Sequence, residues 1–263
     1  MKIKVAIVQM EIFDGEKEKN LYNALIILKS IVKLNELPDI VCFPELFTTG
    51  YDLQNVGNYA ELLPGNTTQK IATISRNKCI VIGSILERIE NEFYNTAFVI
   101  NKKGEISGKY RKIHLFSPML EKEYLTPGDK IQVFNMPELN NLTIGVAICY
   151  DIRFPELFRT MALMGAQIIF IPSEFPDPKK KIWKSLLYAR AIENQLYIIA
   201  INRVGKGKHN SFFGYSLISN GDYLEHLEDL PETKIFLIDT DTLVQIRESL
   251  PVFKDRRPEL YKI

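Results

Sequence analysis

Short apolar runs alternate with longer helix-like patterns along most of this chain. Short β-branched and aliphatic runs are typical of strands buried on both faces, and apolar residues repeating every three to four positions are typical of amphipathic helices. We expect strands at 4–10, 39–45, 79–86, 94–100, 105–114, 142–148, 166–172, 196–202, 214–219 and 234–240. We expect helices at 17–35, 66–77, 155–165, 179–195 and 241–249.

This alternation predicts an α/β fold. Helices between strands imply crossover connections and parallel pairing, whereas closely spaced strands near 79–112 and 196–219 imply hairpins. So many apolar strands need cover on both faces, which a four-layer αββα sandwich provides, with two mixed sheets face to face and helices outside. No stretch has linker composition, so we expect a single domain over 1–263. The charged tail, about 250–263, is a candidate for packing on a partner subunit, which favours a homodimer or higher homo-oligomer.

Composition excludes several classes of function. The 263 residues carry a formal net charge of +1, from 33 basic and 32 acidic residues, which gives no reason to expect a nucleic-acid or membrane partner. No signal peptide or membrane span is visible. The three cysteines, at 42, 79 and 149, are too few for a disulfide framework, and we expect a cytoplasmic protein. The histidines lack ligand spacing, so we expect no metal, and the chemistry below requires no cofactor.

The segment TIGVAICYDIRFPE, residues 143–156, places Cys149 at the end of a strand and polar residues directly after it. A strand, a tight turn and a helix together resemble the arrangement that exposes a nucleophile in many hydrolases. The N–H groups that follow such a residue can stabilise an oxyanion. Cys42 and Cys79 lie inside apolar runs, where a cysteine is ordinarily a small buried side chain. Cys149 is therefore the candidate nucleophile.

A cysteine nucleophile needs a base. Glu45 follows a buried strand, where partial desolvation favours proton uptake, although it also fits the first turn of a helix after Pro44. In GKYRKIHLF, strand alternation puts Lys112 on the face of Tyr110 and His114. His114 offers an alternative, a Cys–His hydrolase.

Three segments, FPELFTTGY, GKYRKIHLF and GVAICYDIRFPE, occur in this order and resemble the catalytic segments of the carbon–nitrogen hydrolase (nitrilase) superfamily. The resemblance extends from KVAIVQM to RRPELY and implies a Glu–Lys–Cys triad in an αββα sandwich. It implies that Glu45 is the general base, Lys112 the cationic stabiliser and Cys149 the nucleophile. The stretch EKEYLTPGD resembles the family segment with a second glutamate, which indicates Glu121, with Glu123 as the neighbouring alternative.

The resemblance implies a cysteine-dependent amidohydrolase that converts a small carboxamide to a carboxylate and ammonia through a thioester. CYDIRFPE is most similar to the branch that holds ω-amidases and Nit1-like amidases. N-carbamoyl amine or amino-acid hydrolysis, nitrile hydrolysis and a catalytically silent scaffold are the alternatives. Because a silent homologue is expected to lose at least one triad residue, the intact triad favours an enzyme.

Residues in the motif loops are candidates for contact with the substrate. Aromatic pocket walls are expected from Tyr51, Phe116, Tyr150 and Phe175. Arg153 can hold a substrate carboxylate with its two-pronged guanidinium, or else form a salt bridge with Asp151 or Glu156. Glu174 stands where the ω-amidases have a small residue, and its charge is expected to disfavour an anionic substrate unless the side chain turns outward.

Overall fold

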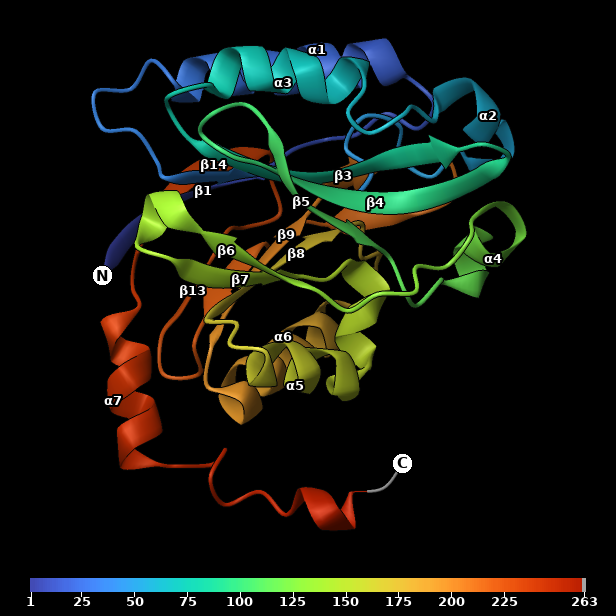
Figure 1. The fold of residues 1–263 in the computed structure, drawn as a ribbon. Helices are drawn as coiled ribbons and strands as arrows, with labels where there is room; N and C mark the ends of the chain where they lie inside the picture. The colour runs from blue at the N-terminus through green and yellow to red at the C-terminus, as the bar shows by residue number, and fades with distance from the viewer. Residues whose placement is uncertain (262–263) are drawn as a thin grey trace.

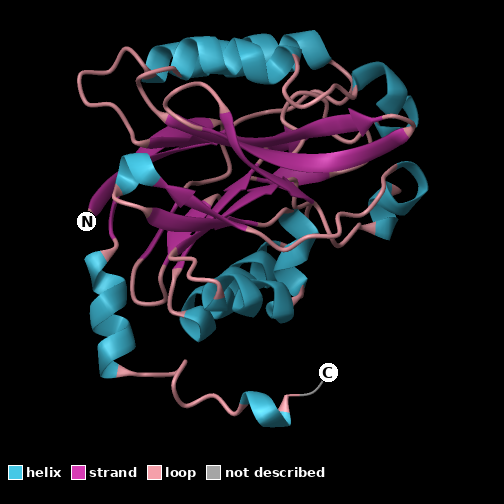
Figure 2. Cartoon of the chain, viewed as in Figure 1, coloured by secondary structure: helices cyan, strands magenta, loops and turns pink. Residues whose placement is uncertain are grey.

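The computed structural model describes residues 1–261, whose strands form two mixed six-stranded sheets packed face to face (Figures 1 and 2). The first sheet has the order β14-β1-β2-β3-β4-β5, in which β1, β2 and β3 are parallel. Its strands are β1 Lys2–Gln9, β2 Ile40–Cys42, β3 Ile80–Ile89, β4 Glu92–Ile100, β5 Ile106–Arg111 and β14 Glu232–Asp239. Strand β1 pairs antiparallel with β14 along its whole length, so the first and the last strand of the chain are neighbours in this sheet.

The second sheet has the order β13-β12-β9-β8-β7-β6, in which β7, β8 and β9 are parallel. Its strands are β6 Val133–Met136, β7 Leu142–Val146, β8 Ile168–Ser173, β9 Tyr197–Asn202, β12 Leu217–Ser219 and β13 Leu224–His226. A separate hairpin joins β10 Val204–Lys206 to β11 Ser211–Phe213.

Helices form the two outer layers. Helices α1 and α3 lie over the first sheet, and α5 and α6 lie over the second (Figure 1). The bounds are α1 Lys17–Ile31, α2 Val56–Tyr59, α3 Asn66–Ser75, α4 Glu121–Tyr124, α5 Pro155–Leu163, α6 Lys180–Asn194 and α7 Asp241–Ser249. Short 3-10 helices span Leu53–Asn55, Ser117–Met119, Pro137–Leu139, Cys149–Arg153 and Pro258–Leu260. The predicted αββα sandwich is confirmed. Among residues 1–261, no helix combines the length and the apolar character needed to cross a membrane.

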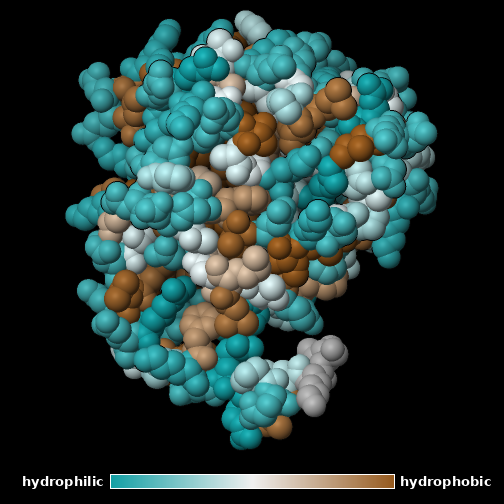
Figure 3. Space-filling model, viewed as in Figure 1, coloured by the Kyte–Doolittle hydropathy of each residue, from teal (hydrophilic) through white to brown (hydrophobic). Residues whose placement is uncertain are grey.

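Strand β1 shows why the central strands are apolar at nearly every position: both of its faces are buried. Its residues Val5 and Ile7 face the second sheet, whereas Ala6 and Val8 pack beneath the outer helices. All four are completely buried. Burial of each larger aliphatic side chain contributes about 1.5–3 kcal/mol, so both faces of the sheet stabilise the sandwich. The surface above α1 and α3 is mostly hydrophilic (Figure 3).

Several elements differ from the expectation. The strand predicted at 39–45 pairs only as far as Cys42, because the chain then turns across the sheet end, with Leu46 in a left-handed conformation at φ 41°. The pattern did not predict β6, β13 or the β10–β11 hairpin, since these strands are short and partly exposed. The turn after β2 matters for function because it carries Glu45.

Candidate active site

The candidate catalytic residues meet at the carboxyl ends of parallel strands from both sheets. Glu45 follows β2, Cys149 follows β7 and Glu174 follows β8. The backbone N–H of Glu174 donates a hydrogen bond to Oε2 of Glu45 at 2.8 Å, which links the two sheets at this end. Carboxyl ends of parallel strands are the usual site of ligand binding in α/β folds.

Lys112, the residue after β5, joins the two predicted glutamates. Its Nζ lies 2.8 Å from Oε1 of Glu45 and 2.7 Å from Oε1 of Glu121, and all three side chains are fully buried. Burial by itself lowers the pKa of Lys112, but Glu121 and Glu45 outweigh that effect and raise it above its ordinary value. Lys112 therefore stays charged. Glu123, the alternative to Glu121, is exposed on α4.

Tyr51 bridges the same two carboxylates instead of forming a pocket wall. Its hydroxyl lies 2.7 Å from Oε1 of Glu45 and 2.8 Å from Oε1 of Glu121. Burial, reinforced by Glu121 and Glu45, raises the pKa of Tyr51 well above its ordinary value, so the phenol keeps its proton. One hydroxyl proton cannot serve two carboxylates at once. Burial also raises the pKa of Glu121, against the effect of Lys112 and with that of Glu45, which favours proton uptake there.

Asn95 is a further partner of Glu45 that the sequence reasoning missed. Its Nδ2 donates to Oε1 of Glu45 at 2.7 Å from the middle of β4. Four groups thus donate to this carboxylate: Lys112, Tyr51, Asn95 and the N–H of Glu174. The available signal was a lone amide within the apolar run 94–100. This set of donors fixes the orientation of Glu45.

Cys149 begins a 3-10 helix in a left-handed backbone conformation, with φ 43°. A non-glycine residue in this region is strained, and such strain is concentrated at functional sites. Burial raises the pKa of the Cys149 thiol well above its ordinary value, Glu45 acts in the same direction, and Lys112 opposes them. The resting side chain is therefore a neutral thiol, which needs a nearby base to become a nucleophile.

Asp151 holds the turn that carries Cys149, although sequence reasoning had considered it only as a salt-bridge partner of Arg153. Its Oδ2 accepts hydrogen bonds from the Tyr110 hydroxyl and the Ile148 N–H, both at 2.8 Å. Its Oδ1 lies 2.7 Å from Nδ1 of His114, whose ring stacks on Phe154 at 3.6 Å between centroids. His114 therefore braces the turn through Asp151, whereas the charged side chains that shift the pKa of the Cys149 thiol are Glu45, Lys112 and Glu121.

A small pocket opens beside Cys149. Its lining is formed by Phe116, Tyr150, Arg153, Glu174, Phe175, Pro176 and Lys179. The Phe116 and Tyr150 rings are 4.8 Å apart, and Phe175 is supported from behind by the buried Trp183 ring at 5.1 Å. Tyr51 is not among the lining residues. The pocket is thus aromatic on most sides, with charged groups from Arg153, Glu174 and Lys179.

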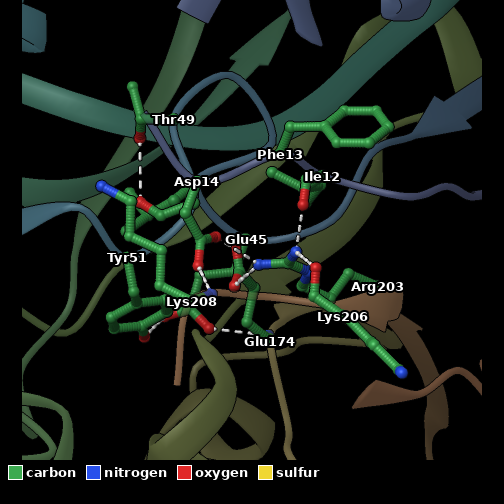
Figure 4. A network of polar contacts seen from close by, with 12 residues as sticks. Ile12, Phe13, Asp14, Glu45, Thr49, Tyr51, Glu174, Arg203, Lys206 and Lys208 are labelled. Atoms are coloured by element: carbon green, nitrogen blue, oxygen red, sulfur yellow. Dashed lines mark hydrogen bonds and ion pairs between the residues drawn. The ribbon is translucent and has the colours of Figure 1, made fainter. Parts of the chain in front are cut away.

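Arg153 and Glu174 differ from what the sequence suggested. Within the described chain, Arg153 forms no ion pair with Asp151 or Glu156; its guanidinium lies about 6 Å from the Tyr150 and Phe175 rings. Glu174 is fully buried, and Oε2 accepts a hydrogen bond from Nη1 of Arg203 at 2.6 Å (Figure 4). Sequence reasoning considered the charge of Glu174 without a partner, and the structure pairs it with Arg203, 29 residues later in the chain.

Among residues 1–261, no group of three or more His, Cys, Asp or Glu side chains is arranged to hold a metal ion. The four donors on Glu45 are nitrogen and hydroxyl groups of the chain itself. The arrangement can instead move a proton from a thiol to a carboxylate beside a fixed ammonium.

Comparisons with known proteins agree with this geometry. The family model described as carbon-nitrogen hydrolase matches residues 4–242. The 2-oxoglutaramate amidase of Bacillus subtilis is 38% identical, covering 99% of this chain and 100% of its own length. The omega-amidase NIT2 of Homo sapiens is 30% identical, covering 99% and 97%. The crystal structure of Saccharomyces cerevisiae Nit3, a member of branch 10 of the nitrilase superfamily, is 27% identical, with a TM-score of 0.88 and coverage of 97% for both chains.

Proposed function

The chain belongs to the carbon–nitrogen hydrolase family, and from this premise we propose that it is an amidohydrolase acting on a small carboxamide. The observation that carries the proposal is the buried Lys112 ammonium, which lies within 2.8 Å of both Glu45 and Glu121 beside the Cys149 pocket. The names of the Bacillus subtilis and human relatives support an amide as the substrate. We assign the roles of nucleophile to Cys149, of base to Glu45, of cation to Lys112 and of second carboxylate to Glu121.

In the first half of the reaction, the thiol sulfur of Cys149 attacks the amide carbon while Glu45 takes the thiol proton. The carbonyl carbon becomes tetrahedral and its oxygen becomes an oxyanion, which Lys112 and the backbone N–H of Tyr150 stabilise. Donors placed in advance for a developing oxyanion contribute roughly 3–4 kcal/mol each. Glu45 then gives its proton to the amide nitrogen, the C–N bond breaks, and ammonia leaves behind a thioester.

In the second half, water hydrolyses the thioester. Glu45, again a carboxylate, takes a proton from the water as its oxygen attacks the acyl carbon, and the C–S bond breaks. The proton returns to the sulfur, which restores the neutral thiol favoured by burial. Glu121 orients this water, a role for which its position beside Lys112 and Tyr51 is suited.

The substrate we propose is an ω-amide, an amide with a carboxylate at its far end. Arg153 lines the pocket without an ion-pair partner among residues 1–261, and Lys179 lines it as well. A guanidinium suits a carboxylate because it offers two parallel N–H donors. The name of the Bacillus subtilis relative supports this choice, since a 2-oxoglutaramate amidase acts on such a molecule.

The proposal is tested by ammonia release from a panel of ω-amides, simple amides, carbamoyl compounds and nitriles. Wild-type protein is expected to release ammonia fastest from an ω-amide, and mass spectrometry of quenched reactions is expected to find the acyl group on Cys149. Cys149→Ala is expected to release none while keeping its melting temperature, with Cys79→Ala as the matched control. Activity in Cys149→Ala, or silence of the wild type across the panel, would refute the proposal.

We also propose a homodimer in the cytoplasm. The three cysteines are buried free thiols, which a reducing compartment preserves. The segment after α7 returns to α5, where Phe253 packs against the hydrophobic core and lies beneath Arg159, yet Leu250, Leu260 and Tyr261 are each more than half exposed. Light scattering of the full chain and of a chain ending at residue 249 tests the dimer, and a full chain that is monomeric at micromolar concentration would contradict it.

A further inference from the structure

Glu174 contains an oxygen that neither the fold nor the proposed mechanism uses. Its Oε2 accepts the hydrogen bond from Arg203, but Oε1 is buried and has no partner among residues 1–261. The residue lines the Cys149 pocket, and its backbone N–H is bonded to Glu45. A buried polar atom without a partner is costly, and in a ligand pocket it points to a group that the ligand supplies.

The charges around Glu174 determine which form of the carboxyl is present. Arg203 pairs with it and also with Asp14, at 2.8 Å, so one guanidinium serves two carboxyls. Lys208 bonds Asp14 only through its backbone N–H (Figure 4). The ammonium of Lys208 pairs with Asp52 at 3.0 Å.

On the opposite side, the single ammonium of Lys112 is shared by Glu45 and Glu121. Together, four carboxyls share the two buried cations, Lys112 and Arg203: those of Glu45, Glu121 and Glu174, which are fully buried, and that of Asp14, whose side chain is 7% exposed. Tyr51, which faces the same cluster, stays neutral. When a buried cluster contains more carboxyls than cations, repulsion between the carboxylates favours protonation of one carboxyl.

Glu174 is well placed to hold such a proton. Burial raises the pKa of Glu174 to about 8, against the effect of Arg203, and Asp14 and Glu45 add to the rise. With Oε2 accepting from Arg203, the proton belongs on Oε1, the atom without a partner. Arg153 and Lys179, on the pocket lining, are left to face the anionic end of a substrate.

We propose that Glu174, in its neutral form, donates the Oε1 hydrogen to an oxygen on the carbon chain of the substrate, so that the enzyme selects ω-amides bearing an oxo group over unsubstituted ones. This inference rests on the proposed ω-amidase function and deepens it. It assigns Glu174 the role of a specificity residue, and it reverses the sequence-based expectation that this side chain acts through a negative charge.

The experiment compares kcat/KM for 2-oxoglutaramate and for glutaramate, which lacks the oxo oxygen, between pH 6 and pH 10. The readout is the ratio of the two values at each pH, in which the titration of Cys149 and Glu121 cancels. In the wild type we expect the ratio to fall about tenfold as the pH rises through about 8, since an ionised Glu174 has no hydrogen to donate. A neutral donor hydrogen bond of this size corresponds to about 1.4 kcal/mol.

Two variants test whether Glu174 acts as a hydrogen-bond donor or through a negative charge. Glu174→Gln has the same shape and keeps an N–H donor at every pH, so its ratio is expected to stay high and to lose the alkaline fall. Glu174→Ala lacks the donor, and its ratio is expected to drop about tenfold at pH 6. Glu156→Gln, on the exposed surface of α5, is the matched control and should behave as the wild type. Melting temperatures check that each variant is folded.

The inference is overturned if Glu174→Gln loses the oxo preference as fully as Glu174→Ala, because the charge would then be the active feature. It is also overturned if Glu174→Ala slows both substrates by the same factor, which is the behaviour of a purely structural carboxyl. A wild type that cleaves neither compound refutes the proposed function itself, and the inference with it.

Discussion

Replacing Lys112 by methionine removes the one cation between two buried carboxylates while keeping the length of the side chain. Glu45 and Glu121 are then left with Tyr51, Asn95 and backbone donors but no compensating charge. Breaking a buried ion pair by deleting one partner costs about 3–5 kcal/mol of unfolding free energy. We expect Lys112→Met to lose about this much at pH 8.5, together with all measurable ammonia release.

The loss of unfolding free energy caused by Lys112→Met is expected to be smaller at low pH. Without Lys112, the folded-state pKa of one carboxyl rises above its unfolded value, and a carboxyl of this kind supports the fold at low pH and ceases to do so as the pH rises through its folded-state pKa. Below that pKa, each pH unit restores about 1.4 kcal/mol per proton taken up. The difference in stability between wild type and variant should therefore narrow by about 2–3 kcal/mol from pH 8.5 to pH 6.

Urea unfolding at the two pH values measures this difference. The double variant Lys112→Met/Glu121→Gln removes one carboxylate together with the cation, so it should regain most of the stability at pH 8.5, lose the pH dependence and stay inactive. Lys2→Met, at the exposed first position of β1, is the control and should change stability by less than about 0.5 kcal/mol. If Lys112→Met is equally destabilised at both pH values and the second substitution restores nothing, the shared-charge reasoning is wrong.

Three further predictions follow from the polar contacts of the site. Tyr51→Phe should lower kcat about ten- to hundredfold with a modest drop in melting temperature, because a hydrogen bond to a charged group is worth about 1.5–3 kcal/mol; an unchanged kcat in steady-state assays would contradict it. Asp151→Asn should lower the free energy of unfolding, measured in urea, by about 2–4 kcal/mol, because the amide has one acceptor oxygen where the carboxylate has two that contact Tyr110, His114 and Ile148. A loss below about 0.5 kcal/mol would count against the bracing role. Because the folded-state pKa of Glu174 is raised to about 8, its proton supports the fold fully only below the unfolded-state value of 4.5, and the support is lost as the pH rises through about 8. The melting temperature of Glu174→Gln relative to wild type should therefore rise between pH 5 and pH 9, and a constant difference would argue against the raised pKa.

Local sequence patterns predicted the layers of this fold because each central strand and outer helix carries its own periodic signal. The period-two alternation in β5 likewise separated Lys112, which is buried, from Lys109 and Arg111, which pair with Glu87. Such signals depend only on neighbours along the chain. They extend to any element long enough to complete a period, and they miss short edge strands such as β6.

Contacts between distant segments were beyond the reach of pattern reasoning. Nothing near Glu174 in the sequence indicates Arg203, and nothing near Glu45 indicates Asn95. Tyr51 was expected to pack as an apolar ring, whereas its hydroxyl joins two carboxylates that lie far from each other in the sequence. Local patterns indicated Cys149 as the nucleophile and Glu45 as a possible base, but their grouping with Lys112 as a triad came only from the family resemblance, because the three residues lie in segments far apart in the sequence.

The pairing of β1 with β14 has a consequence for biosynthesis. Lys2 lies opposite Asp239 and Gln9 opposite Glu232, so this side of the first strand to leave the ribosome stays unpaired until the last strand has been synthesised. Until then, one side of β1 presents unpaired N–H and C=O groups along an apolar strand, a state prone to edge-to-edge association. A nascent chain stalled before residue 232 is therefore a natural client for chaperones, and release from the ribosome is the moment at which this half of the molecule can close.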